Sequence, residues 1–97
     1  MNKKYKILTV DDEPVNLKLL EAHLVPRGYE VLQAKNGLEA LEVLSREPIY
    51  IVLLDVIMPQ INGFEVLKKI RADEKLRLIP VILVTALKAT EDRITGI

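Results

Sequence analysis

The stretch "ILTVDDEPVN", residues 7–16, joins an apolar segment to three consecutive acids and a proline. Lys6–Val10 is short and rich in branched residues, which predicts a β-strand. Pro14 suits the first position of a helix, and Asp12 or Glu13 is suited to cap that helix. Carboxylates cost free energy to crowd together. Acids at the end of a core strand therefore need an explanation beyond local structure.

The same succession of strand and helix repeats along the chain. We expect further strands at Tyr29–Ala34, Tyr50–Asp55 and Pro80–Thr85. We expect helices that begin at Pro14, at Asn36-Gly37 and at about Phe64, with the start of a fourth in Lys88–Ile97. The third and fourth strands are continuously apolar, which is typical of a parallel sheet. The sequence therefore predicts an α/β fold with a doubly wound parallel sheet in the order 2-1-3-4.

The composition limits the classes of function. With 97 residues the chain forms one domain, residues 1–97, and its 14 basic and 14 acidic side chains give no field that favours nucleic acid. The absence of cysteine excludes thiolate zinc sites and fits a reducing cytoplasm, where we expect the protein to act. The longest apolar run, Ile49–Leu54, is too short to span a membrane.

Four side chains with oxygen atoms are expected at one edge of the sheet. Asp11 and Asp12 follow the first strand, Asp55 ends the third strand beside it, and Thr85 ends the fourth. Ligands bind at this edge, where neighbouring connections run in opposite directions. Because all the candidate ligands are oxygens, the cluster favours Mg²⁺, with Mn²⁺ as a second option.

Asp55 is the candidate nucleophile of this cluster. It ends a buried strand and is therefore held rigidly, and a carboxylate can take a phosphoryl group as an aspartyl phosphate. The hydroxyl of Thr85 and the backbone N–H of Ala86 or Val56 are available to donate to phosphoryl oxygens. The sequence thus predicts phosphoryl chemistry at the strand ends.

Three segments, "VDDEPVN", "VLLDVIMPQINGFEVL" and "PVILVTA", together resemble the receiver domain of two-component response regulators, in order from Lys6 to about Ala86. The resemblance implies a flavodoxin-like receiver fold and a phosphoryl donor that is a histidine kinase or phosphotransfer protein. It also implies roles for the matching residues. Asp11, Asp12, Asp55 and the backbone carbonyl of Ile57 would bind the metal, and Asp55 would also be the phosphoacceptor. Thr85 would be the switch hydroxyl, Ala86 would leave room for the phosphoryl group, and Met58, Pro59 and Gly63 would shape the loop.

The sequence departs from the family pattern in two places. Asn62 stands where many members carry aspartate. Members also continue with a fifth strand, which ends in a lysine, and a fifth helix, whereas this chain ends at Ile97 and Lys88 does not match that lysine. We therefore expect a receiver that is incomplete at its carboxyl end, with the fourth strand as an exposed apolar edge open to dimerisation or domain swapping.

Three classes of function remain open at this point. A receiver is a phosphoacceptor module that catalyses only its own phosphorylation and dephosphorylation, so it is not a conventional enzyme. A phosphohydrolase needs a second aspartate just after the nucleophile, and Val56 and Ile57 stand there instead. The alternative is a truncated structural or dimerising fragment in which the missing lysine impairs phosphorylation.

Overall fold

The computed structural model describes residues 4–55 and 63–84 of the chain. In chain order the elements are β1 (Lys6–Val10), α1 (Pro14–Leu24), the 3₁₀ turn η1 (Val25–Arg27), β2 (Glu30–Ala34), α2 (Gly37–Arg46), β3 (Ile51–Asp55), α3 (Gly63–Ala72) and β4 (Val81–Val84). The expected bounds are confirmed to within two residues wherever the described ranges allow the comparison. The fourth helix expected in Lys88–Ile97 lies outside those ranges.

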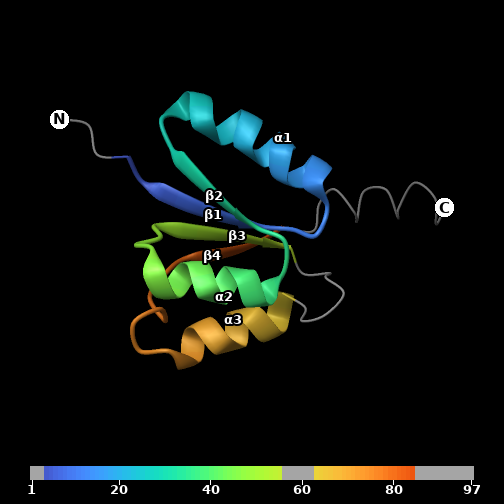
Figure 1. Cartoon of the computed structure of the whole chain (residues 1–97). Coiled ribbons are helices and arrows are strands. Elements are labelled where there is room, and N and C mark those ends of the chain that lie inside the picture. Colours follow the sequence, from blue (N-terminus) through green and yellow to red (C-terminus); the bar gives the residue numbers. More distant parts are fainter. Residues whose placement is uncertain (1–3, 56–62, 85–97) are drawn as a thin grey trace.

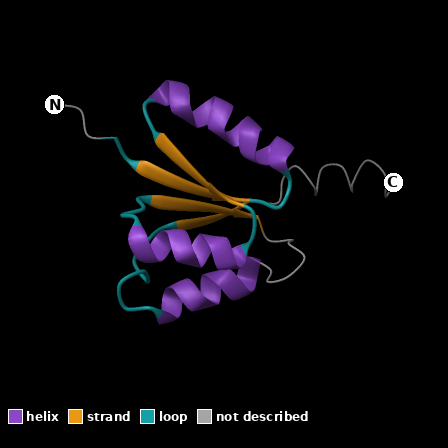
Figure 2. Cartoon of the chain, in the orientation of Figure 1, coloured by secondary structure: helices purple, strands orange, loops and turns teal. Residues whose placement is uncertain are grey.

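The strands form one parallel sheet in the order β2-β1-β3-β4, as the sequence predicts. In Figure 1, α1 covers one face of this sheet, and α2 and α3 lie side by side on the other. Figure 2 shows the same three layers by type of element. Because all the pairings are parallel, the four strands end on the same side of the sheet, and α1, α2 and α3 follow β1, β2 and β3 from that side. None of the helices in the described ranges is long and apolar enough to cross a membrane.

The centre of the sheet is the hydrophobic core. The side chains of Leu8, Val52 and Leu54 on β1 and β3 are fully buried. Helix α3 adds Val66 and Ile70, which are also fully buried and stand four residues apart on one face of the helix. This packing fixes the two central strands on which the acidic residues stand.

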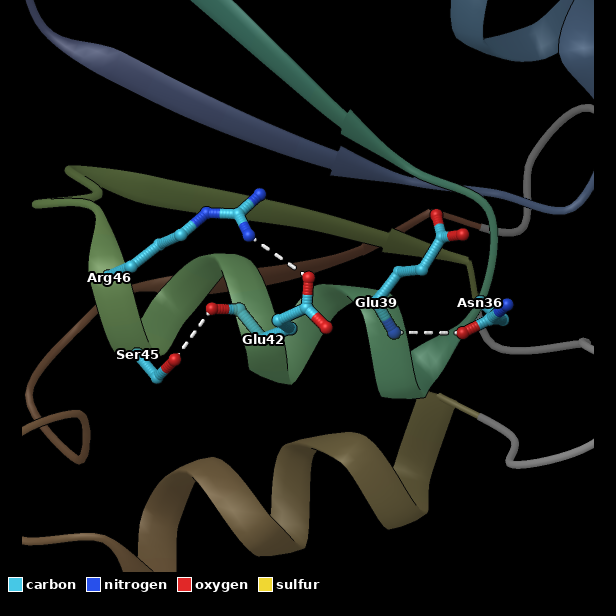
Figure 3. Close-up of polar contacts among 5 residues, drawn as sticks. All are labelled: Asn36, Glu39, Glu42, Ser45 and Arg46. Carbon is cyan, nitrogen blue, oxygen red and sulfur yellow. Dashed lines mark hydrogen bonds and ion pairs between the residues drawn. The ribbon is translucent and has the colours of Figure 1, made fainter.

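Helices α1 and α2 begin differently. Asn36 caps α2, because its side chain accepts a hydrogen bond of 2.8 Å from the backbone N–H of Glu39 (Figure 3). Glu13 occupies the corresponding position of α1 but makes no capping bond with its side chain. Glu13, one of the two positions expected to cap α1, is therefore its N-cap residue but caps it without its side chain. The carboxylate of Asp11, at the end of β1, accepts a hydrogen bond from the N–H of Glu13.

The sheet has one apolar edge within the described residues. Strand β4 pairs with β3 on one side, and its Ile82 and Leu83 are 50% and 36% exposed. The continuous apolar pattern of the fourth strand thus does not bring burial, whereas three of the five residues of β3 are buried and the other two are half-buried. The sequence-based expectation of an exposed apolar fourth strand agrees with this arrangement.

Candidate functional site

Three aspartates meet at the edge of the sheet where β1 and β3 end. Asp11 follows β1 directly, Asp55 is the last residue of β3, and these two strands are neighbours. Asp11 and Asp55 are only 5% and 2% exposed, and Asp12 is half-buried. One carboxylate oxygen from each residue lies within 4.8 Å of the others. The parallel topology therefore brings together the three carboxylates that the sequence singles out.

Asp11 is held by bonds to three other residues. Its backbone N–H donates to the carbonyl of Ala34 at 3.1 Å, so the pairing of β1 with β2 continues into the cluster. Its Oδ1 accepts from the N–H of Glu13 at 2.9 Å, and its Oδ2 accepts from the side-chain amide of Asn16 at 3.1 Å. Both oxygens of the carboxylate are thus fixed in direction before any ligand binds.

Asn16 was not among the site residues predicted from the sequence. The signal was present, because an amide in the first turn of α1 stands five residues after Asp11, directly beyond a strand end. Amide side chains at helix starts usually form hydrogen bonds with the nearby backbone. A bond from Asn16 to the carboxylate of Asp11 is therefore not the first expectation from the sequence.

The cluster has the chemistry of a cation site. Three carboxylates at this separation repel one another, and a divalent cation offsets that repulsion. The donors are all oxygens, which suits a hard cation. These residues could hold a metal ion, and they stand where β1 and β3 end, at the switch point of the strand order.

Other predicted site residues lie outside the described ranges: Val56, Ile57, Met58, Pro59, Asn62, Thr85 and Ala86. Their roles stay predictions. Two described residues border them. Gly63 begins α3 and is buried, and Val84 pairs with Asp55 in the β3–β4 register. The backbone therefore reaches the position before Thr85 directly beside Asp55.

Comparison with protein families and curated proteins gives a consistent result. The family described as the response regulator receiver domain matches residues 7–97. The response regulator PleD of Caulobacter vibrioides is 47% identical over 92 residues, which are 95% of this chain and 20% of PleD. The probable transcriptional regulator ycf27 of Pyropia yezoensis is 45% identical over 96 residues, 99% of this chain and 38% of that protein. The chain therefore spans well under half the length of these relatives.

Solved structures share the fold. The N-terminal domain of a response regulator receiver protein from Methanoculleus marisnigri superposes with a TM-score of 0.81 at 35% identity, over 94% of this chain and 78% of that one. The receiver domain of a sensor histidine kinase from Pseudomonas aeruginosa gives a TM-score of 0.82 at 34% identity, over 94% and 75%. That second structure has a magnesium ion coordinated in its active-site cleft.

Proposed function

The chain belongs to the response regulator receiver domain family, and from this premise we propose that it accepts a phosphoryl group on Asp55 and acts as a signalling switch. Receiver domains are signalling modules rather than classical enzymes. The observation that carries the proposal is the position of Asp55, which is 2% exposed at the end of β3 with Asp11 and Asp12 within 4.8 Å.

The proposed reaction is transfer from a phosphohistidine. A carboxylate oxygen of Asp55 attacks phosphorus, the new O–P bond forms, the P–N bond breaks, and the imidazole leaves and takes up a proton. The donor is a histidine kinase or a phosphotransfer protein. Burial at the end of a core strand supports the role of Asp55, because it holds the nucleophile in one orientation for in-line attack.

We place a magnesium ion at the acidic cluster. Asp11, Asp12 and Asp55 would hold it, together with the backbone carbonyl of Ile57, and Mn²⁺ is a chemically similar substitute. When bound, it neutralises charge on the transferred phosphoryl group and on the carboxylates. The chain's own contribution is to keep three carboxylates together at the cost of their mutual repulsion.

The signalling step follows phosphorylation. In our proposal the hydroxyl of Thr85 donates to a phosphoryl oxygen and Ala86 leaves room for that group, which biases an equilibrium between two conformations. Because Val84 pairs with Asp55, a displacement of Thr85 would pass directly into β4. We further propose that the module acts in the cytoplasm as a single receiver-like domain, residues 1–97, incomplete at the carboxyl end, and that this segment does not bind nucleic acid.

The second candidate is a structural or dimerising fragment that is impaired in phosphorylation. It is favoured by the exposed apolar side chains of Ile82 and Leu83 on β4, which another strand or a second copy of the chain could cover. The two candidates differ in one property, namely whether Asp55 takes up phosphate.

Incubation with acetyl phosphate and Mg²⁺, followed by intact mass measurement, tests the proposal. We expect one added phosphoryl group on the wild-type chain and none on Asp55→Asn. Asp73→Asn is the matched control, because Asp73 lies after α3 and caps the following turn, away from the cluster. A labelled Asp55→Asn chain would refute the assignment, and an unlabelled wild-type chain that still binds Mg²⁺ would favour the fragment.

A further inference from the structure

Asn16 connects the first turn of α1 to the acidic cluster. Its side-chain Nδ2 donates to Oδ2 of Asp11 at 3.1 Å, while the backbone N–H of Glu13 donates to Oδ1 of the same carboxylate at 2.9 Å. Asn16 is half-buried and Asp11 almost completely buried, so water competes weakly for the amide bond. The pair of bonds fixes both the position and the plane of this carboxylate.

We propose that Asn16 is a positioning residue for the cation site, which orients Asp11 so that its carboxylate is ready to bind the ion. This inference rests on the proposed function, because it assumes that the three aspartates bind a divalent cation. A carboxylate oxygen can accept more than one interaction. The bonds from Asn16 and Glu13, one on each oxygen of Asp11, are therefore compatible with a cation on the same carboxylate.

The chemistry of the amide suits this role. An amide is neutral, so it fixes the carboxylate without adding a positive charge that would compete with the cation. Lysine or arginine at the same position would pair with Asp11 and reduce the negative charge of the cluster. Partners of metal ligands commonly set ligand orientation in this way, and their loss typically costs 10- to 100-fold in metal affinity.

A purely local role explains Asn16 less well. Asparagine is a weak helix former, and here its side chain does not serve the helix, because it bonds to a residue that precedes the helix. The backbone N–H of Asn16 is already satisfied by the carbonyl of Glu13 at 3.1 Å. The side-chain bond therefore contributes to the cluster and not to the start of α1.

The chain offers a matched control for a general tie between sheet and helix. The side-chain amide of Gln33, on β2, donates to the carbonyl of Leu17 in α1 at 3.4 Å. It holds the same helix to the sheet through the same chemical group without contacting the aspartates in the described structure. Loss of this amide should affect stability alone.

The test compares Asn16→Leu and Asn16→Ala with Gln33→Leu in the whole chain. Leucine has the branching of asparagine but no donor, and alanine guards against a folding defect caused by the bulk of leucine. Mg²⁺ affinity is measured by isothermal titration calorimetry, and thermal unfolding is followed with Mg²⁺ and with EDTA. We expect both Asn16 variants to raise the Kd for Mg²⁺ by about 10- to 100-fold, and so to reduce the rise in Tm that Mg²⁺ produces.

A phosphorylation assay adds a readout that a merely structural role would not move. With acetyl phosphate as donor, the Asn16 variants should need more Mg²⁺ for half-maximal rate and should approach the wild-type rate when Mg²⁺ saturates. Gln33→Leu should lower Tm equally with and without Mg²⁺ and leave the Kd unchanged.

The outcomes separate this inference from the proposed function. Wild-type Mg²⁺ affinity in the Asn16 variants, or an equal loss in Gln33→Leu, would overturn the inference and leave the proposed function intact. A wild-type chain that binds no Mg²⁺ would refute the cation site itself, and the inference with it.

Discussion

Charged side chains are arranged differently at the two ends of the parallel strands. At the edge where the strands end, Asp11, Asp12 and Asp55 bring like charges together, two of them almost completely buried. At the edge where the strands begin, Lys6 and Glu47 form an ion pair of 2.8 Å, with side chains that are 27% and 33% exposed.

Neutral side chains also mark the edge where the strands begin. The rings of Tyr5 and Tyr50 pack against each other there, with their centroids 4.5 Å apart and their planes tilted by 36°. At that edge the ion pair and the ring pair are both made within the chain. The edge with the aspartates carries carboxylates whose repulsion a bound cation would relieve. The side chains where the strands begin thus form contacts that stabilise the fold, and those where the strands end form the proposed functional site. Substitutions at each end can test this separation.

The largest expected loss of stability comes from the buried centre of the sheet, which lies between the two ends of the strands. Leu54→Ala removes a fully buried side chain of β3 next to Asp55, and we expect a loss of about 2–5 kcal/mol in the free energy of unfolding. Tyr50→Ala, at the other end of the same stretch, removes an exposed ring and should cost less. Urea denaturation measures both. Equal losses would contradict the expectation that the buried centre of the sheet contributes more to stability than the exposed ring at the start of β3.

The cap of α2 is expected to have an intermediate effect. Asn36 lies at the edge with the aspartates and accepts from the N–H of Glu39, so Asn36→Ala should destabilise the chain by about 1 kcal/mol. Ser45→Ala is the control, because its exposed hydroxyl only donates to the carbonyl of Glu42 within the helix (Figure 3). Thermal unfolding of the two variants should differ. A larger loss from Ser45→Ala would show that the cap is not what stabilises the helix start.

The smallest effect is expected at the ion pair. The hydrogen bond from Lys6, reinforced by its charge, lowers the pKa of Glu47 below the usual 4.5, and the bond to Glu47 raises the pKa of Lys6 above the usual 10.5 against the opposing effect of desolvation. The lowered carboxyl pKa contributes stability that is fully present above pH 4.5, and this contribution is lost as the pH falls through the folded-state pKa. The raised amine pKa contributes stability that is fully present below pH 10.5, and this contribution is lost as the pH rises through the folded-state pKa.

A double-mutant cycle with Lys6→Met and Glu47→Gln measures this contribution. We expect a small favourable coupling at neutral pH, a decline when Glu47 is protonated in acid, and a decline in high salt, because both side chains are partly exposed. A coupling that survives acid and salt would show that the pair is shielded from solvent more than its exposure indicates.

Topology explains what the sequence could predict. Lys6–Val10 and the order 2-1-3-4 follow from apolar runs that alternate with helices, and the meeting of Asp11 with Asp55 follows because parallel strands end at one edge. Contacts made by single side chains are harder to predict. Nothing in the local pattern links Lys6 to Glu47, which are 41 residues apart in sequence.

The helical spacing of the leucines does not by itself predict which side chains of α2 are buried. Leu38 belongs to the leucine repeat of this helix, yet its side chain is 61% exposed. The buried face of α2 passes through Ala40, Val43 and Leu44, because the orientation of a helix is set by what it packs against and not by its largest side chains.

The bond from the N–H of Asp11 to the carbonyl of Ala34 makes the aspartate the last rung of the β1–β2 ladder. The backbone of Asp11 consequently has no loop-like freedom, and a displacement of it must break a rung of the sheet. Motions of that kind belong to the slow, cooperative openings of a fold and not to the nanosecond movements of loops. The backbone of Asp11 should therefore keep its position for as long as the pairing of β1 with β2 persists at this end of the sheet.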